Sequence, residues 1–298
     1  MSTSLRFSVI VPTFNRADLL RRCLDALAQQ DYAGPYEVIV VDDGSTDRTP
    51  GVLRSRPGVI HLRQANRGPA AARNRGIAAA TGDILAFTDD DCLVPADWLS
   101  RLADGYVRHP AVAGVGGYLE APTEVLEHNL LARFERSVGR DEYGAGPREV
   151  LGGFDCPAGG TNNMSYRRAV LEEVGGFDEA FPFAAGEDAD LKRRITDRGY
   201  QLLYTPVKVT HLQPYTWDAF RRQHLTRGRG VVHFERKHAG RPPTLTRALL
   251  RLGKRLGLLP VELIRGPDRR LALVRFAARG YDGVGQLREI RRLRQDER

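Results

Sequence analysis

The 298-residue sequence lacks any apolar run close to the roughly 20 residues that a membrane-spanning helix needs. Its first residues also lack the basic and apolar segments of a signal peptide, so we expect a cytoplasmic protein. Only three cysteines occur, Cys23, Cys92 and Cys156, and they are widely separated. This odd, scattered set argues against a disulfide framework and a cysteine-rich zinc site, and predicts three buried or half-buried free thiols.

Lysine is also scarce, and the positive charge is unevenly distributed. Arginine supplies 41 of the 45 basic residues, and the formal net charge is +8. Residues 241–298 hold 15 Arg or Lys against 6 Asp or Glu, so the first 240 residues sum to −1. A domain that reads a nucleic-acid duplex carries its excess positive charge on the folded face, so we expect no nucleic-acid partner.

Apolar β-rich runs alternate with helical stretches in the N-terminal third. The predicted strands are residues 7–12, 37–41, 59–62 and 84–88. Near-continuous apolar strands alternating with helices predict an α/β fold with a mostly parallel sheet covered on both faces. Ligands bind such sheets at the carboxyl ends of the strands. Three of the four strands are followed there by polar loops, TFNR, DDGSTD and TDDDC.

The rest of the chain is predicted to continue this fold and then to change character. A helix, an apolar glycine-rich strand, a surface helix with a loop, and a glycine-rich turn precede a helix starting near Arg167. A last strand ends at His211. We therefore divide the chain into residues 1–100, residues 101–215 and a basic, largely helical extension over residues 216–298.

Leucines recur at helical spacing in this extension. They are Leu245, Leu249, Leu252, Leu256 and Leu259. Arg247, Arg251 and Lys254 occupy the opposite face, and Pro260 is expected to end the helix. A basic amphipathic helix either lies peripherally at the inner face of an anionic membrane or packs on the body with a solvated arginine face. The sequence leaves both alternatives open.

Three consecutive carboxylates, Asp89, Asp90 and Asp91, follow the fourth predicted strand. Adjacent like charges are unfavourable unless a positive group lies beside them. A divalent cation is a natural partner, because Mg2+ and Mn2+ bind carboxylate and phosphate oxygens and can neutralise a departing diphosphate. The alternative is a solvated acidic turn or a helix N-cap, although Asp97, directly before Trp98, is the better cap candidate.

A second acidic turn, Asp42, Asp43, Gly44 and Ser45, follows the second predicted strand. A carboxylate at this position can accept hydrogen bonds from a nucleobase or a ribose. The same residue types are ordinary turn formers, so the turn alone does not decide between the two interpretations.

Six segments occur in a fixed order: VIVPTFNR, VVDDGSTD, NRGPAAARNRG, FTDDDCLVPADWL, GGTNNMSYRR and GEDADLKRR. Together they resemble the successive motifs of family 2 glycosyltransferases, over residues 5–215. The resemblance implies a GT-A fold, a Mn2+ or Mg2+ cofactor and inversion at the anomeric carbon. It also implies a nucleotide-diphosphate sugar donor and a hydroxyl acceptor, a saccharide or lipid-linked glycan in cell-surface polysaccharide synthesis.

The resemblance further implies roles for individual residues in the donor site. Residues that contact the nucleoside correspond here to Pro12, Thr13, Phe14, Asn15, Arg16 and Asp43, with Asp42 assisting. Arg73 corresponds to a residue near the nucleotide. Asp89, Asp90 and Asp91 correspond to the DxD-type motif, in which Asp90 approaches the ribose and Asp91 binds the metal. His211 matches a position that in some members supplies another metal ligand, whereas a lone histidine is more often structural.

Two further positions carry roles by the same resemblance. Asp188 matches the general base that deprotonates the acceptor hydroxyl, with Glu187 as the competing assignment; Asp188 could otherwise form an i, i+4 ion pair with Lys192. The segment QHLTR, which ends at Arg227, resembles the QxxR part of the QxxRW motif of processive members. Gly228 replaces the tryptophan, which puts processivity in doubt, and Arg227 remains a candidate contact for the diphosphate.

Other functional classes fit the sequence less well. A sugar nucleotidyltransferase is expected to have a glycine-rich phosphate loop directly after the first strand, where this chain has TFNR. A dinucleotide oxidoreductase needs G-x-G-x-x-G after a strand, and none occurs in that context. A non-catalytic sugar-nucleotide-binding protein predicts the loss of a metal or base carboxylate, yet Asp91 and Asp188 are both present.

Overall fold

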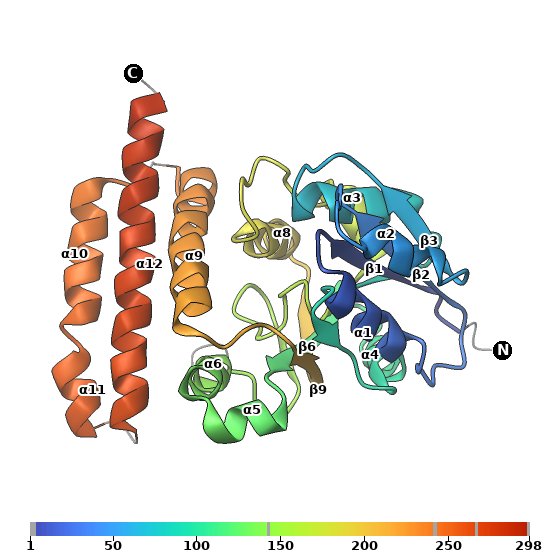
Figure 1. The fold of residues 1–298 in the computed structure, drawn as a ribbon, viewed down its shortest axis with the longest axis horizontal. Helices are drawn as coiled ribbons and strands as arrows, with labels where there is room; N and C mark the ends of the chain where they lie inside the picture. Colours follow the sequence, from blue (N-terminus) through green and yellow to red (C-terminus); the bar gives the residue numbers. More distant parts are fainter. Residues whose placement is uncertain (1–3, 142–143, 241–242, 266–267, 297–298) are drawn as a thin grey trace. The chain divides into compact units, whose positions relative to one another are not determined.

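The computed structural model describes residues 4–141, 144–240, 243–265 and 268–296. The chain folds into two compact units, and Figure 1 labels most of their elements. The first unit comprises Met1–Pro122, Val138–Ala180 and Asp188–Gln213, and the second comprises Thr123–Ser137, Phe181–Glu187 and Pro214–Arg298.

One mixed sheet forms the centre of the first unit. Its strands are β1 (Phe7–Thr13), β2 (Tyr36–Asp42), β3 (Val59–Arg63), β4 (Ile84–Phe87), β5 (Cys92–Leu93), β6 (Gly114–Glu120), β7 (Val150–Gly152), β8 (Met164–Arg167) and β9 (Leu202–His211). Over the described residues their order is β3-β2-β1-β4-β8-β6-β9-β5, and β7 pairs with β9. Strands β1 to β4 run parallel, which confirms the predicted α/β sheet.

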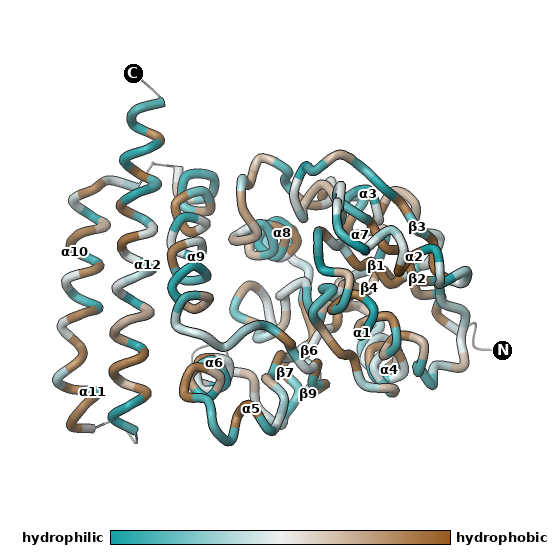
Figure 2. The backbone as a smooth tube through the Cα atoms, in the orientation of Figure 1, coloured by the Kyte–Doolittle hydropathy of each residue, from teal (hydrophilic) through white to brown (hydrophobic). Residues whose placement is uncertain are grey.

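Helices cover both faces of this sheet. Those of the first unit before β9 are α1 (Ala17–Leu27), α2 (Thr49–Arg54), α3 (Pro69–Ala79), α4 (Trp98–Arg108), α7 (Arg168–Val174) and α8 (Glu187–Thr196), whereas α5 (Thr123–His128) and most of α6 (Leu130–Asp141) belong to the second unit. Val9 and Val40 pack in one apolar cluster with residues of α1 and α4. Ile10 and Ile39, on the opposite face, pack with residues of α3, α7 and α8. Figure 2 shows β1 and β2 as brown, apolar segments, in agreement with burial on both faces.

The helix predicted to start near Arg167 is present as α7, which begins at Arg168. The sequence did not reveal the strand between the glycine-rich turn and this helix, β8, which pairs antiparallel with β4 and β6. Strand β8 has four residues, too few for a recognisable alternation. Asp97 is the N-cap residue of α4 as predicted, yet its side chain accepts no capping hydrogen bond. All three cysteines are free and buried, as predicted.

Four helices make up most of the second unit: α9 (Trp217–His238), α10 (Leu245–Leu256), α11 (Leu259–Arg265) and α12 (Arg269–Asp296). Helix α12 packs against α9 on one side and against α10 and α11 on the other (Figure 1). The prediction that Pro260 ends the leucine helix is wrong, because α10 already ends before Gly257. Pro260 lies in the first turn of α11, where its missing N–H costs no helical hydrogen bond. Of the helices that the structure describes, none has the length and apolar character needed to cross a bilayer.

Two glycines allow the backbones of α9 and α12 to cross in direct contact. A Cβ atom added to Gly228 would lie 2.0 Å from the carbonyl oxygen of Asp282. One added to Gly285 would lie 2.2 Å from the carbonyl oxygen of Leu225. Because no side chain fits at either distance, the crossing depends on glycine at both positions.

We expect Gly285→Ala to lower the free energy of unfolding by about 1–3 kcal/mol, because the added methyl group forces the two helices apart. Gly280→Ala in the same helix is the matched control, since a Cβ there meets no described atom within 4 Å beyond its own turn. Alanine favours a helix over glycine by up to about 1 kcal/mol, so this control is expected to be neutral or stabilising. Denaturant unfolding followed by circular dichroism measures both, and equal stabilities would contradict the crossing.

Candidate active site

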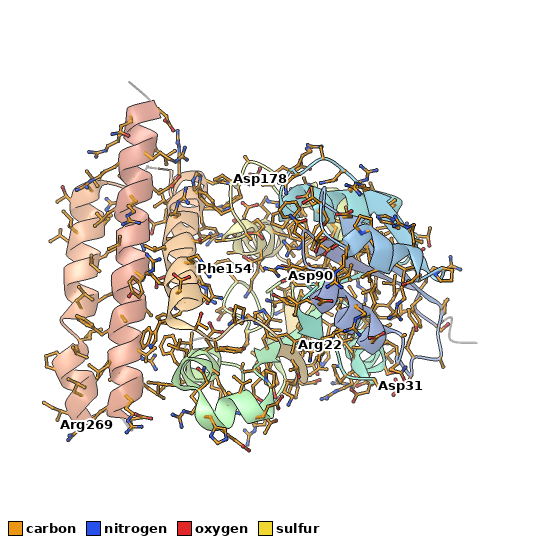
Figure 3. The ribbon with its side chains drawn as sticks, viewed as in Figure 1. Arg22, Asp31, Asp90, Phe154, Asp178 and Arg269 are labelled. Atoms are coloured by element: carbon orange, nitrogen blue, oxygen red, sulfur yellow. The ribbon has the colours of Figure 1, made fainter. Side chains whose placement is uncertain are left out.

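The polar loops after β1 and β4 meet at the carboxyl end of the sheet, where parallel neighbouring strands end side by side. The hydroxyl of Thr13 donates a 2.7 Å hydrogen bond to Asp90. Arg16 Nη1 donates to Asp90 at 3.0 Å and to Asp91 at 2.8 Å. Asp90, labelled in Figure 3, and Asp91 are both buried. Arg16 therefore offsets part of the cost of holding two carboxylates away from water.

The two carboxylates titrate differently. Burial raises the pKa of Asp90 to about 6, although Arg16 and the Thr13 hydroxyl favour the ionised form. Burial acts on Asp91 as well, but the hydrogen bond and charge of His211, together with the charge of Arg16, outweigh it and lower the pKa of Asp91. Asp91 is therefore ionised at neutral pH, as a carboxylate that binds a metal has to be.

His211 approaches Asp91 through a strand pairing that the sequence did not reveal. Strand β5 runs antiparallel to β9, and Cys92 lies opposite His211 in the register. His211 Nε2 lies 3.4 Å from Asp91 Oδ1, and Cys92 Sγ lies 3.8 Å from the same oxygen. Ligand atoms that share one cation at about 2.1 Å lie roughly 3 Å apart, so the first pair has the spacing of a metal site.

The donor atoms decide which of these three residues fit a divalent cation. A carboxylate oxygen and an imidazole nitrogen suit Mn2+, and Mg2+ is held mainly by oxygen. Full burial raises the pKa of the Cys92 thiol well above its usual range, so the thiol stays protonated. Asp91 and His211 thus fit the expected metal. Cys92 was not singled out from the sequence, where its position beside Asp91 was the one available signal.

The acidic turn after β2 is held within a dense hydrogen-bond network. Asp42 is fully buried and accepts a 2.8 Å hydrogen bond from the backbone N–H of Ser45, as a turn former does. Asp43 accepts hydrogen bonds from Gln64 Nε2 at 2.8 Å and from the backbone N–H of Arg67 at 2.9 Å. It also accepts one from the backbone of the residue before α3. Asp43 therefore fixes the loop that leads into α3, a role that no sequence motif indicated.

The loop after β1 is tied to the same turn by Asn15. Its backbone is left-handed, with φ of 54°, a conformation that asparagine tolerates better than most residues. Its side-chain oxygen accepts hydrogen bonds from the backbone N–H of Thr46 at 2.7 Å and of Asp47 at 3.3 Å. Pro12 lies within β1, and Phe14 is 43% exposed. The loop thus presents an aromatic ring at the surface while Asn15 anchors it.

Asp188, the expected base, lies near an ion pair between the buried Arg73 and the half-buried Asp89. Arg73, buried in α3, donates a 2.9 Å hydrogen bond to Asp89. Asp188 lies in the first turn of α8 and accepts a hydrogen bond from the backbone N–H of Ala189. Burial raises the pKa of Asp188; the positive charge of Arg73 opposes this shift, and the negative charge of Asp89 adds to it. A raised pKa brings a carboxylate closer to the range that suits a general base.

The remaining candidate residues occupy other positions. Lys192, the alternative ion-pair partner of Asp188, donates instead to the backbone carbonyl of Cys156. Glu187, the competing base, is buried. Arg227 is exposed on α9. Glu187 and Arg227 belong to the second unit.

The fold has relatives among solved structures. The mannosyltransferase PcManGT from Pyrobaculum calidifontis, in complex with GDP-Man and Mn2+, superposes with a TM-score of 0.68 at 23% sequence identity. The match covers 97% of this chain and 88% of that one. The sheet with its flanking helices is therefore a GT-A-like fold, as the six motifs predicted.

Sequence comparison gives the family. The model of glycosyl transferase family 2 matches residues 8–175, and the chain belongs to this family. Glycosyltransferase AglE of Haloferax volcanii is 32% identical over 218 residues, 68% of this chain and 66% of that protein. The pre-mycofactocin glycosyltransferase of Mycobacterium tuberculosis is 34% identical over 207 residues, 68% of this chain and 41% of that protein. The match thus spans just under two thirds of one relative and about two fifths of the other.

Proposed function

We propose that this protein is an inverting, metal-dependent glycosyltransferase that moves a sugar from a nucleotide-diphosphate sugar to a hydroxyl acceptor. The observation that carries the proposal is the cluster of Arg16, Asp90, Asp91 and His211 at the carboxyl end of the sheet, in a chain of family 2. Family membership disfavours a nucleotidyltransferase. The carboxylates retained in the cluster disfavour a non-catalytic binding protein.

Donor binding is assigned to residues 1–100. The loop of Pro12, Thr13, Phe14, Asn15 and Arg16 borders the nucleoside together with Asp43, while Asp42 supports the turn. The exposed face of Phe14 offers a stacking surface to the base. Asp90 faces the ribose, and Arg73, already paired with Asp89, lies near the nucleotide. Arg227 is proposed to contact the diphosphate.

Asp91 and His211 would hold Mn2+ or Mg2+. A cation bound there supplies positive charge against the charge that develops on the leaving nucleoside diphosphate. The ionised state of Asp91, maintained by His211 and Arg16 against the effect of burial, keeps the carboxylate ready for this role.

Asp188 is the proposed base, in the acceptor half that comprises residues 101–215. An acceptor hydroxyl is a poor nucleophile, and its proton has to leave as the new bond forms. A carboxylate within hydrogen-bond reach can accept that proton, for a gain of about 10²–10⁴ in rate. One base on the side opposite the leaving group gives in-line displacement, and hence inversion at the anomeric carbon.

A panel of nucleotide sugars, assayed for hydrolysis and for transfer with and without Mn2+ or Mg2+, tests this function. We expect at least one donor to be consumed, faster with metal than with a chelator. Product NMR then reports the anomeric configuration, which is expected to be opposite to that of the donor. A panel in which no donor is consumed, with any metal, would contradict the proposal.

The extension over residues 216–298 is proposed to bring the enzyme to an anionic membrane, where a lipid-linked acceptor resides. Helix α10 packs on α12 through Ala248 and Leu252. Leu249, expected on the packed face, is 55% exposed, and Leu250 and Ile264 are 70% and 81% exposed. Exposed leucines beside exposed basic residues of the same helices are typical of an interfacial surface.

Flotation with phosphatidylcholine vesicles that contain phosphatidylglycerol measures this contact. We expect the full chain to float with these vesicles at low salt, and the double variant Leu250→Ser, Ile264→Ser to bind about tenfold more weakly because it loses apolar burial. Val107→Ser, which changes a 67% exposed residue of the first unit, is the control. Equal flotation of all three proteins would favour the alternative, a helix with a solvated arginine face.

A further inference from the structure

A surface hollow of about 340 Å³ lies between α9 and α12 in the second unit. Its lining includes four arginines: Arg222 and Arg229 from α9, and Arg288 and Arg292 from α12. Thr226 contributes a hydroxyl, and Glu289 is the one carboxylate among the lining residues. None of these positions belongs to the donor site proposed above, and the inference below goes beyond that function.

The glycine crossing determines the shape of the hollow. Gly285, which also lines it, brings α12 into backbone contact with α9 at Leu225. Arg222 and Arg229 are seven residues apart on α9, and Arg288 and Arg292 are four apart on α12, so each pair lies on one face of its helix. Residues of these two faces line one hollow beside the crossing.

Glu289 acts as an internal anchor for two of these arginines. Its side chain is 1% exposed and accepts hydrogen bonds from Arg229 at 2.8 Å, Arg292 at 2.5 Å and His233 at 3.0 Å. Burial alone would raise the pKa of Glu289, but these hydrogen bonds lower it to about 2. The carboxylate is therefore a permanent charge that orients Arg229 and Arg292.

The lining nevertheless carries an excess of positive charge. Arg222 pairs with Asp218 on its own helix, and Arg292 also reaches Asp296 at 3.0 Å. Arg288 is exposed and forms no ion pair with any residue that the structure describes. Four arginines line the hollow, and the carboxylates of Glu289, Asp218 and Asp296 pair with three of them, so one positive charge is left in excess and an anion that enters gains charge-assisted hydrogen bonds from arginines of both helices.

We propose that this hollow binds a phosphate-monoester group. A guanidinium fork matches phosphate oxygens, and a tetrahedral dianion can be held by arginines from two directions, whereas a planar carboxylate is satisfied by one fork. The volume exceeds the need of a free phosphate ion and is at the lower end for small-molecule pockets. The ligand is therefore a phosphorylated small molecule, such as a sugar phosphate, or the phosphomonoester head group of a lipid.

The test compares two double variants of the full chain that remove the same charge from the same helices. Arg222→Gln with Arg288→Gln changes the hollow, and Arg221→Gln with Arg291→Gln changes neighbouring exposed arginines. Arg221 pairs with Asp218 just as Arg222 does, which makes the doubles closely matched. Titration calorimetry with glucose 1-phosphate in a chelator, which excludes cation-mediated binding at the donor site, measures the affinity. Circular dichroism verifies that both variants are folded.

We expect wild type and the control double to bind glucose 1-phosphate with similar affinity, and the hollow double to bind at least about tenfold more weakly, as expected for the loss of two charge-assisted contacts. Vesicles with phosphatidic acid or phosphatidylglycerol then identify the source. If the protein prefers phosphatidic acid over phosphatidylglycerol, and only the hollow double loses this preference, the ligand is a lipid head group. If the protein binds glucose 1-phosphate but shows no preference for phosphatidic acid, the ligand is a soluble molecule. Equal affinities in the two doubles, or no binding of either probe by wild type, overturn the proposal.

Discussion

Replacing Asp188 with asparagine is expected to lower kcat for transfer by about 10²–10⁴-fold while the dissociation constant of the donor stays within about twofold. The amide keeps the size and the hydrogen bond to Ala189 but cannot accept the acceptor proton. Donor binding depends on the loops after β1, β2 and β4, which this substitution leaves unchanged. Single-turnover kinetics and donor titration measure the two quantities separately.

The pH profile gives the same prediction a second readout. A base has to be ionised, so wild-type activity is expected to fall as the pH falls through the pKa of Asp188. Burial raises that pKa against the opposing charge of Arg73, so the acidic limb lies above the ordinary range of an aspartate. Asp188→Asn is expected to lose this limb. Glu187→Gln is the matched control and should keep normal turnover; the reverse result, with Asp188→Asn active, would assign the base to Glu187.

Replacing Asp91 with asparagine is expected to remove metal-stimulated turnover, a loss of about 10³-fold that corresponds to several kcal/mol of charge stabilisation. Asparagine keeps the shape of the side chain but lacks the negative charge of the Asp91 carboxylate, which His211 and Arg16 keep ionised. His211→Ala is expected to weaken Mn2+ binding by about 10–100-fold and to spare part of the turnover. Mn2+ titration followed by electron paramagnetic resonance and by kcat measures both effects.

Cys92→Ser is the control for the metal site. Its thiol lies beside Asp91 but is buried and protonated, so we expect the serine variant to keep the wild-type response to Mn2+. An Asp91→Asn enzyme that is still activated by Mn2+ would contradict the assignment of Asp91. Loss of the metal response in Cys92→Ser, with the fold intact, would show that the thiol is a ligand.

The edge of the sheet that carries the site could be predicted because parallel topology follows from local patterns. Apolar runs alternating with helices predict parallel strands, and parallel strands bring their carboxyl ends together. That reasoning gathers Thr13 and Asp90 at one edge, where the structure joins them by a hydrogen bond. It needs no knowledge of register, since all of these loops follow the ends of neighbouring strands.

The contacts that long-range register determines could not be predicted. His211 meets Asp91 because the two-residue strand β5 pairs with the end of β9, and two residues show no periodicity. The bonds from Gln64 and Arg67 to Asp43 come from the irregular loop before α3, whose motif shows which residues occur there but not the backbone geometry that they adopt. Motif resemblance identified His211 as a candidate, and only the fold shows that the candidate lies within reach of Asp91.

The helical unit shows the same limit. The spacing of leucines predicted α10, but it placed Leu249 on the packed face and took Pro260 as the end of the helix. The structure exposes Leu249 and puts Pro260 inside the next helix, because packing on α12 determines which face is buried. The close crossing at Gly285 likewise depends on a partner helix that the sequence pattern of α12 alone does not reveal.

Binding of nucleotide sugars to the full chain tests the central claim most directly. Titration calorimetry with uridine, guanosine, thymidine, adenosine and cytidine diphosphate sugars, at concentrations up to millimolar, covers the donor bases. The account predicts that at least one donor binds in the presence of Mn2+ and that Asp91→Asn weakens this binding. A chain that binds none of them, with Mn2+ or without it, would contradict the assignment of the cluster around Asp91 as a glycosyltransferase donor site.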